Sequence, residues 1–414
     1  MKIPDLFKRK KNKKKQAGQN SQNSTITINY PNTEEPINKL IELAQNYKSQ
    51  GKYKEAEPVS LEILTILETK FGKEHPKVAS ALNLVAELYR MQGKYKQAEP
   101  LYIKCLGIRE KMIGKDHPDT AEVLNNLAEL YRMQGKYKQA EPIYKKDLEI
   151  TEKSLGKDHT NIAFTLNNLA TLYRSQGKYK EAEPLYKRSL GILEKSFGKD
   201  HPNIATSLNN LAALYVDQDK YEEAESFYKR SIEIDKKFLG KDHPNIAIAL
   251  NNLAAFYVDQ DKYKQAEPLY IRSLEILEKS LGIDHPETAI TLSNLADFYK
   301  HQDKYKEAEP LYRRSLGILE KNLGKDHPNI AYTLGSLADL YRMQEKYEEA
   351  EPLYKRSIGI SEKALGKDHP FYKSMIESYM IILVLKSGQS EDITNVNLQT
   401  VVNNYLYDKK TGRQ

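Results

Sequence analysis

Apolar residues along most of the chain recur at the three-and-four spacing that is typical of amphipathic helices. Residues 201–242 contain two such stretches, with a short polar turn between them. The stripe of the first stretch consists of Ala205, Leu208, Leu211, Ala212 and Tyr215. The stripe of the second consists of Tyr221, Ala224, Tyr228, Ser231 and Ile232. The pattern therefore predicts two antiparallel helices joined by a tight turn.

This helix pair recurs with a period of 42 residues. Histidine marks the period at residues 75, 117, 159, 201, 243, 285, 327 and 369. Units of this length form arrays in which each copy buries its apolar face against the next. The sequence thus predicts an all-α fold, namely a right-handed superhelical α-solenoid of about eight helix pairs. The apolar segment 379–385 predicts a C-terminal capping helix.

The boundaries of the helices are marked in the same places in each copy. Glycine at 72, 114, 156, 198, 240, 282, 324 and 366 is expected to end the second helix in a left-handed conformation. The sequence Asp-His-Pro that usually follows predicts a new helix, with Pro at its first position and Asp or His as its cap.

The pattern Leu-x-x-Leu-Ala-x-x-Tyr, followed by Gly-Lys-Tyr-x-x-Ala, resembles the tetratricopeptide repeat. The 42-residue period and the segments LNNLAELYRMQGKYKQAEPIYKKDLEI (124–150) and LGKDHPNIA resemble the repeats of kinesin light chains in particular. The resemblance implies a peptide or helix bound in a concave groove that the first helices line. Kinesin light chains also carry a heptad coiled coil before their repeats. The 36 residues before the repeats contain no heptads, which favours a free-standing scaffold.

A helical wheel separates the buried stripe of the first helix from an open arc. With Leu208 at zero and about 100° per residue, Asn209, Asn210, Ala213 and Val216 fall on the open arc. Asparagine recurs there in six copies, as Asn83, Asn125, Asn126, Asn167, Asn168, Asn209, Asn210, Asn251, Asn252 and Asn294. Stacked amides offer donors and acceptors to an extended peptide backbone. The alternative is that Asn only tolerates a solvated helix face.

The last position of the open arc changes along the chain. It reads Arg90, Arg132, Arg174, then Val216, Val258, then Lys300 and Arg342. This order predicts a groove with an apolar centre and cationic ends, suited to a peptide whose hydrophobic anchor is flanked by acidic residues. The alternative is that these cations form ordinary pairs with Glu87, Glu129, Asp297 and Asp339, three residues earlier.

The formal net charge of +7 belongs to the first 15 residues, and the rest of the chain is balanced. We therefore expect three parts: a basic, disordered tail (1–36), the solenoid with its cap (37–388), and a C-terminal tail (389–414) with one weak helix. The run Lys8–Lys15 is most simply a solvated tail, and contact with an anionic membrane or a nucleic acid is the alternative. The single cysteine, Cys105, and the lack of a signal-peptide pattern indicate the cytoplasm.

The sequence offers little for catalysis. The periodic histidines lack the paired spacing of zinc sites, and no phosphate loop or catalytic triad stands out from the repeats. We therefore expect no enzyme, metal, cofactor or small-molecule substrate. The leading hypothesis is a scaffold that binds a protein or peptide. The alternatives are a self-associating structural protein, a kinesin-light-chain-like cargo adaptor, and a recognition subunit for an enzyme on another chain.

Overall fold

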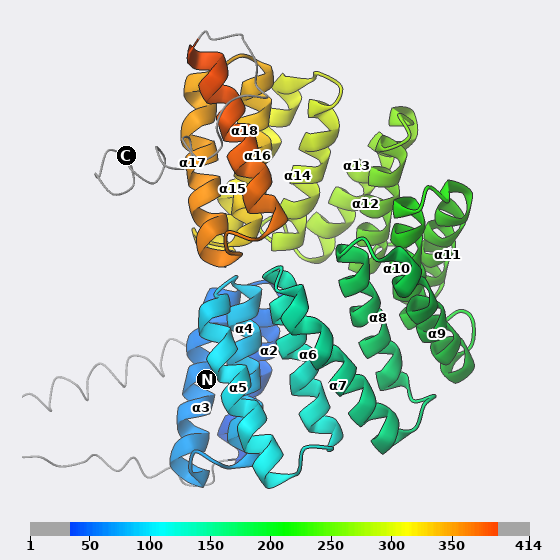
Figure 1. The fold of residues 1–414 in the computed structure, drawn as a ribbon, viewed down its shortest axis with the longest axis vertical. Coiled ribbons are helices and arrows are strands. Elements are labelled where there is room, and N and C mark those ends of the chain that lie inside the picture. Colours follow the sequence, from blue (N-terminus) through cyan, green and yellow to red (C-terminus); the bar gives the residue numbers. More distant parts are fainter. Residues whose placement is uncertain (1–33, 388–414) are drawn as a thin grey trace, which may run out of the picture. The chain divides into compact units, whose positions relative to one another are not determined.

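The computed structural model describes residues 34–387, and these form seventeen α-helices and no strands. Eight helix pairs follow one another along the chain, and a single helix covers the last pair (Figure 1). The first helices of the pairs are α2 (Glu34–Ser49), α4 (Pro76–Met91), α6 (Pro118–Met133), α8 (Thr160–Ser175), α10 (Pro202–Asp217), α12 (Pro244–Val258), α14 (Pro286–Lys300) and α16 (Pro328–Met343).

The second helices are α3 (Tyr53–Phe71), α5 (Tyr95–Met112), α7 (Tyr137–Leu155), α9 (Tyr179–Phe197), α11 (Tyr221–Leu239), α13 (Tyr263–Ser280), α15 (Tyr305–Leu323) and α17 (Tyr347–Ala364), and the capping helix is α18 (Pro370–Ser387). The predicted all-α superhelical solenoid is confirmed. Lys8–Lys15 and the C-terminal tail lie outside the described residues. The packing described below is that of residues 40–387.

Histidine starts each first helix from α4 onward. In α16, Nδ1 of His327 accepts a hydrogen bond from the backbone N–H of Asn329 at 3.0 Å, and Pro328 occupies the first helical position. The same cap forms at His75, His117, His159, His201, His243, His285 and His369. Because Nδ1 satisfies a backbone donor that the helix leaves free, the histidine has a structural role at these positions.

The glycines between repeats differ from the prediction in one angle. Gly156 has φ 87° and ψ 155°, so φ is positive as expected, but the backbone is extended and not in the left-handed helical region. This conformation is open essentially to glycine alone. The left-handed residue lies instead in the turn inside each repeat. It is a glycine in repeats 1–4, at Gly51, Gly93, Gly135 and Gly177, and an acidic residue in repeats 5–8, at Asp219, Asp261, Asp303 and Glu345.

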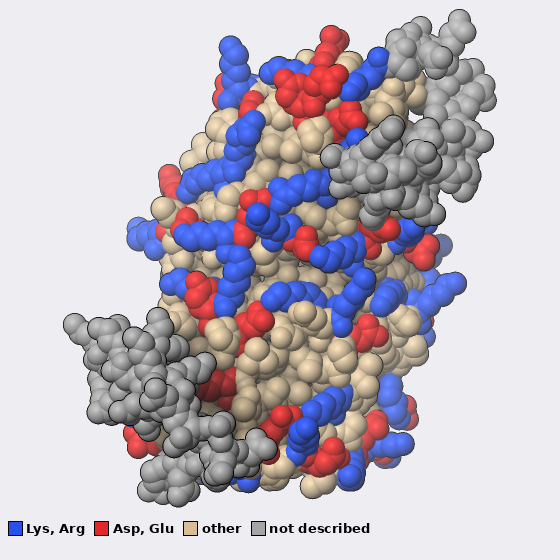
Figure 2. All heavy atoms as spheres, turned by 90° about the vertical axis from the view of Figure 1, so that its left-hand side faces the viewer, with Lys and Arg blue, Asp and Glu red and all other residues tan. Residues whose placement is uncertain are grey.

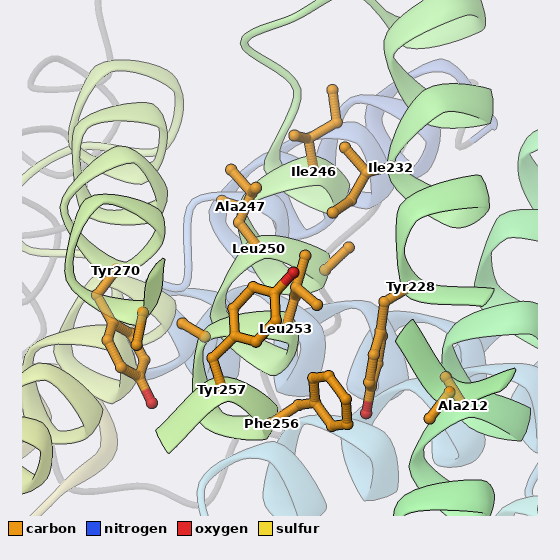
Figure 3. Close-up of a cluster of buried hydrophobic side chains, with 14 of the residues drawn as sticks. Ala212, Tyr228, Ile232, Ile246, Ala247, Leu250, Leu253, Phe256, Tyr257 and Tyr270 are labelled. Carbon is orange, nitrogen blue, oxygen red and sulfur yellow. The ribbon is translucent and has the colours of Figure 1, made fainter. Parts of the chain in front are cut away.

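Small residues and tyrosines let the helices pack closely. Ala212 and Ala224 are fully buried, and Tyr228 is buried with them in the cluster drawn in Figure 3. Between the helices of one repeat, Oγ of Ser231 donates a hydrogen bond to the carbonyl of Ala205 at 2.8 Å. This bond recurs in repeats 4, 6, 7 and 8, where Ser189, Ser273, Ser315 and Ser357 donate to Ala163, Ala247, Ala289 and Ala331.

Ion pairs join each repeat to the next. Lys237 pairs with Asp200 at 2.6 Å, and Arg230 pairs with Glu194 at 3.1 Å. Equivalent pairs recur along the solenoid, so Lys and Arg alternate with Asp and Glu over the face shown in Figure 2. Exposed pairs of this kind contribute at most about 1 kcal/mol each, but they help to fix the angle between neighbouring repeats.

The first repeats also contact the last ones. Tyr53 and Leu88 from repeats 1 and 2 share one buried cluster with Leu292, Leu323 and Ile330 from repeats 7 and 8. Within residues 40–387 the two ends of the repeat array therefore pack against each other as two layers.

Candidate peptide-binding groove

All the predicted groove residues lie on first helices, from α4 to α16. They share one side of these helices, here named the groove face, and most of them are half-buried. Asn167 and Asn251 are more enclosed, with 7% and 9% of their surface exposed. Half-buried side chains on aligned helices keep fixed positions, so the face can offer a regular array of contacts.

The asparagines of the groove face bond to one another between repeats. The three amide bonds run from Asn126 to Asn83 at 3.2 Å, from Asn168 to Asn125 at 3.0 Å and from Asn252 to Asn209 at 3.2 Å. Asn167 instead donates to Oγ of Ser207 at 3.1 Å. These amides therefore tie neighbouring repeats together, and each keeps one further N–H for another partner.

The sequence predicted five cations on the groove face. Four of them form an ion pair with a carboxylate of the chain. Arg132 donates two hydrogen bonds to Glu129, at 2.7 and 2.6 Å. Burial acts to raise the pKa of Glu129, but the bonds from Arg132 outweigh it and hold that pKa below its ordinary value. Lys300 and Arg342 pair with Asp297 at 2.7 Å and Asp339 at 3.3 Å, and Arg174 pairs with Asp217 of the next repeat at 2.6 Å.

Arg90 differs from the other cations. Its expected partner Glu87 pairs with Lys48 at 2.7 Å instead. Its Nη1 lies 3.4 Å from Sδ of Met133, and its Nε is buried without a partner among the described residues. Arg90 therefore forms no direct ion pair with a carboxylate among the described residues, but Glu87, Glu129 and the hydroxyl of Tyr102 interact with its charge.

The centre of the groove face is apolar, and it includes residues that the sequence reading missed. Val216 and Val258 are half-buried against the central cluster, as their positions suggested. Phe164, Ile248 and Tyr332 lie at one equivalent position of α8, α12 and α16 and are 47%, 42% and 41% exposed. On the helical wheel this position falls opposite the buried stripe. Burial in the solenoid core therefore does not explain a large apolar residue there.

A cleft opens on the groove face near the capping helix. It has a volume of ≈ 360 Å³ and is lined by residues of α14, α16 and α18, including Asp297, Tyr332, Asp339, Phe371 and Met375. The rings of Tyr332 and Phe371 lie 3.9 Å apart between centroids. Both carboxylates are held in place, because Tyr312 donates to Asp297 and Tyr354 donates to Asp339, each at 2.5 Å.

Repeat 8 has Gly335 where repeats 2–6 have an asparagine, and this exchange shapes the cleft. A Cβ at residue 335 would lie 2.6 Å from Sδ of Met375. Glycine therefore lets α18 approach α16 and close the end of the groove face. Among residues 34–387 no cluster of three or more His, Cys, Asp or Glu could hold a metal ion, and no helix is long and apolar enough to cross a membrane.

The model of the family described as tetratricopeptide repeat matches residues 36–111, 86–153, 119–195, 162–237, 245–321 and 288–363. The chain therefore belongs to the tetratricopeptide repeat family. Its repeats are of the 42-residue kind that the sequence pattern had linked to kinesin light chains. A search of curated proteins finds no match.

Several solved structures are similar. The quorum sensor NprR from B. thuringiensis is 16% identical with a TM-score of 0.54, over 86% of this chain and 93% of that one. A Rap protein complexed with Competence and Sporulation Factor is 16% identical with a TM-score of 0.50, over 80% and 98%. A kinesin light chain with TPR-like repeats from Podosopora anserina is 23% identical with a TM-score of 0.43, over 50% and 98%. The NprR and Rap likenesses show the solenoid fold.

Tetratricopeptide repeats form scaffolds for protein–protein interaction, and this is the general class of function that the repeats assign to the chain.

Proposed function

We propose that the chain is a non-enzymatic adaptor that holds a peptide or a helical segment along the groove face of repeats 4–8. The observation that carries the proposal is the row formed by Phe164, Ile248 and Tyr332, which are exposed at one position of alternate first helices, namely α8, α12 and α16. An apolar ligand side chain buried against such a residue gains about 1.5–3 kcal/mol. Asparagine N–H groups beside the row can orient the ligand backbone.

The ends of the ligand are proposed to carry acidic residues, as the cations of the groove face suggest. An acidic ligand must compete with the chain's own carboxylates at Arg132, Arg174 and Arg342. At Arg90 no carboxylate of the described residues forms a direct ion pair, although Glu87 and Glu129 interact with its charge. We therefore propose an acidic flank beside Arg90, which requires the ligand to extend from the apolar row in repeats 4–8 to repeat 2.

Two features of the solved relatives and of the chain agree with this proposal. The Rap protein of similar fold was solved with a bound factor, and the free cysteine Cys105 is buried, in keeping with a reducing compartment such as the cytoplasm. Self-association and a role beside an enzyme on another chain are the competing proposals, and both predict that the groove face can be changed without loss of function.

A random peptide library displayed on phage tests the proposal. Peptides selected on the intact chain should share a hydrophobic anchor and should bind the Ile248→Glu variant at least tenfold more weakly. Ile271→Glu is the matched control, because Ile271 is also 42% exposed but lies on the second helix α13. Failure to select any peptide, or equal weakening by both substitutions, would reject the groove face as the binding site.

A further inference from the structure

The turn inside each repeat has one left-handed residue, and its identity changes halfway along the chain. The turn has the same backbone in both halves. Lys94 N–H bonds to the carbonyl of Tyr89 beside Gly93, and Lys220 N–H bonds to that of Tyr215 beside Asp219, both at 2.8 Å. The φ angles are 66–70° at the four glycines and 57–59° at the four acidic residues. Local conformation therefore does not decide between glycine and an acidic residue.

What differs is the space beyond the turn. A Cβ at Gly51 would lie 2.5 Å from Cδ of Pro286, and a Cβ at Gly93 would lie 2.5 Å from Cδ of Pro328. At Gly135 the nearest atom would be Cδ2 of His369, at 2.7 Å. The first two turns thus touch the start of a first helix six repeats further along, and the third touches the start of the capping helix α18. No side chain fits between the two sides of these contacts.

Side chains also form hydrogen bonds across this contact. His285 and His327 are 7% and 6% exposed, and they hydrogen-bond to the backbone of Ser49 and Met91 in the turns that they cover. Lys54 donates to the backbone carbonyls of Glu320 at 2.9 Å and Lys321 at 2.5 Å, at the C-terminal end of α15. A cation there is favoured by the helix dipole. We name these residues the layer contact.

The acidic turn residues lie where no other layer covers them. Asp219, Asp261, Asp303 and Glu345 are all exposed. The Gly-Lys-Asp-His-Pro sequence that forms the opposite side of the contact at residues 324–328 also stands at 114–118, 198–202 and 240–244. Every copy of the chain therefore carries additional segments that could cover the turns of another copy.

We propose that the left-handed turn residue decides whether a second layer of helices can stack on a repeat. Glycine in repeats 1–3 lets the chain close on itself through the layer contact. Asp219, Asp261, Asp303 and Glu345 keep the equivalent surface of repeats 5–8 free of a second copy of the chain. Their side chains occupy the space that a stacked Pro or His ring needs. Covering them would also desolvate their charges, at a cost that the single tyrosine hydroxyl bonded to each of Asp219, Asp261 and Asp303 does not offset. This inference does not depend on the groove proposal.

The same substitution at two turns tests the first half of the proposal. Gly93→Asp should keep the helix content, because the chain tolerates Asp in this conformation at residue 219. It should, however, separate the layers, increase the radius of gyration in small-angle X-ray scattering and speed amide exchange in the turn about tenfold. Gly177→Asp is the control, because nothing among the described residues lies within 4 Å of a Cβ there. An unchanged radius for Gly93→Asp would overturn the proposal.

The second half of the proposal predicts that copies of the chain associate when the acidic turn residues are removed. The quadruple variant D219G/D261G/D303G/E345G should form dimers or larger species in light scattering after size exclusion, in proportion to protein concentration, while the parent chain stays monomeric. Glycine adopts the left-handed conformation of this turn without strain, so the variant should fold. A monomeric quadruple variant, or a parent chain that already associates to the same extent, would overturn the exclusion of a second copy.

Discussion

The side-chain amide of Asn168 donates a hydrogen bond to Oδ1 of Asn125, one repeat earlier, at 3.0 Å. Two residues that the sequence predicts to bind a ligand thus also connect neighbouring repeats. The two roles are compatible, because an amide that is fixed by one hydrogen bond presents its remaining N–H in a defined direction.

Replacement of Asn168 by Ala should therefore cost more than the same change at Asn210, which makes no side-chain hydrogen bond among the described residues. Both variants gain helix propensity, so the difference between them isolates the bond and should be about 1 kcal/mol. Urea denaturation of the two variants measures it. Equal midpoints would show that the bond between Asn168 and Asn125 adds nothing to stability.

Asp147 should limit stability at neutral pH. It stands where repeats 4–8 have a buried serine, and it is 2% exposed. Burial raises its pKa to about 6, although Thr165 and Thr151 donate hydrogen bonds to it. Between its unfolded pKa of about 3.9 and 6, the unfolded chain loses the proton first, so the free energy of unfolding falls as the pH rises.

The variant Asp147→Ser should consequently be more stable than the parent by about 1–3 kcal/mol at pH 8 and by much less at pH 4. Its hydroxyl can form the bond to a carbonyl that Ser189 makes to Ala163. Thermal unfolding at the two pH values tests this. A gain that does not change with pH would mean that the carboxylate is not the cause.

His327 should give the opposite pH dependence. Burial in the layer contact lowers its pKa to about 4, against about 6.5 in an unfolded chain. The contact is fully stable above pH 6.5, and its stability is lost as the pH falls toward 4, because only the unfolded chain takes up a proton in this range.

The variant His327→Asn keeps a side chain that can cap α16 but lacks this titration. The difference in melting temperature between parent and variant should therefore be greatest near pH 7.5 and shrink by pH 5. His243→Asn, at a half-exposed cap of α12 outside the layer contact, is the matched control. The same pH profile for both variants would contradict the assignment to the layer contact.

Arg90 should select acidic ligands. For a selected peptide with an acidic flank, Arg90→Gln should weaken binding by about five- to tenfold at low salt and less at high salt, because a charge-assisted hydrogen bond is lost. Arg132→Gln should have a smaller effect, since Arg132 already bonds to Glu129. Isothermal titration at two salt concentrations gives both values. A larger loss at Arg132 would place the acidic flank elsewhere.

The sequence predicts the repeat unit well, because its signals are local. The histidine caps, the glycines and the alanine contacts each depend on a few neighbouring positions, and they recur eight times. The pairs of Arg132 with Glu129 and Arg342 with Asp339 likewise follow from a spacing of three residues on a helix. The exposed Phe164 and Ile248 were missed because the open arc was judged only from the positions equivalent to Asn209, Asn210, Ala213 and Val216.

The layer contact could not be predicted in the same way. Gly93 and His327 are 234 residues apart, and they meet only because small rotations between neighbouring repeats add up over six units. The sequence of a single repeat does not reveal this accumulated rotation. The change from glycine to an acidic residue in the turn is visible in the sequence, but its meaning requires knowing which turns are covered.

The spacing of the layer contact also ties folding to the number of repeats. The turns of repeats 1–3 each meet the helix start that lies six repeat lengths further along the chain. A gene shortened by recombination to six repeats and a capping helix would therefore retain one such contact, and a shorter one would retain none. Below that length, unfolding would spread from unit to unit, as in a one-dimensional array. Above that length, the two ends of the array would be thermodynamically coupled, and loss of repeat 1 would lower the stability of repeat 7.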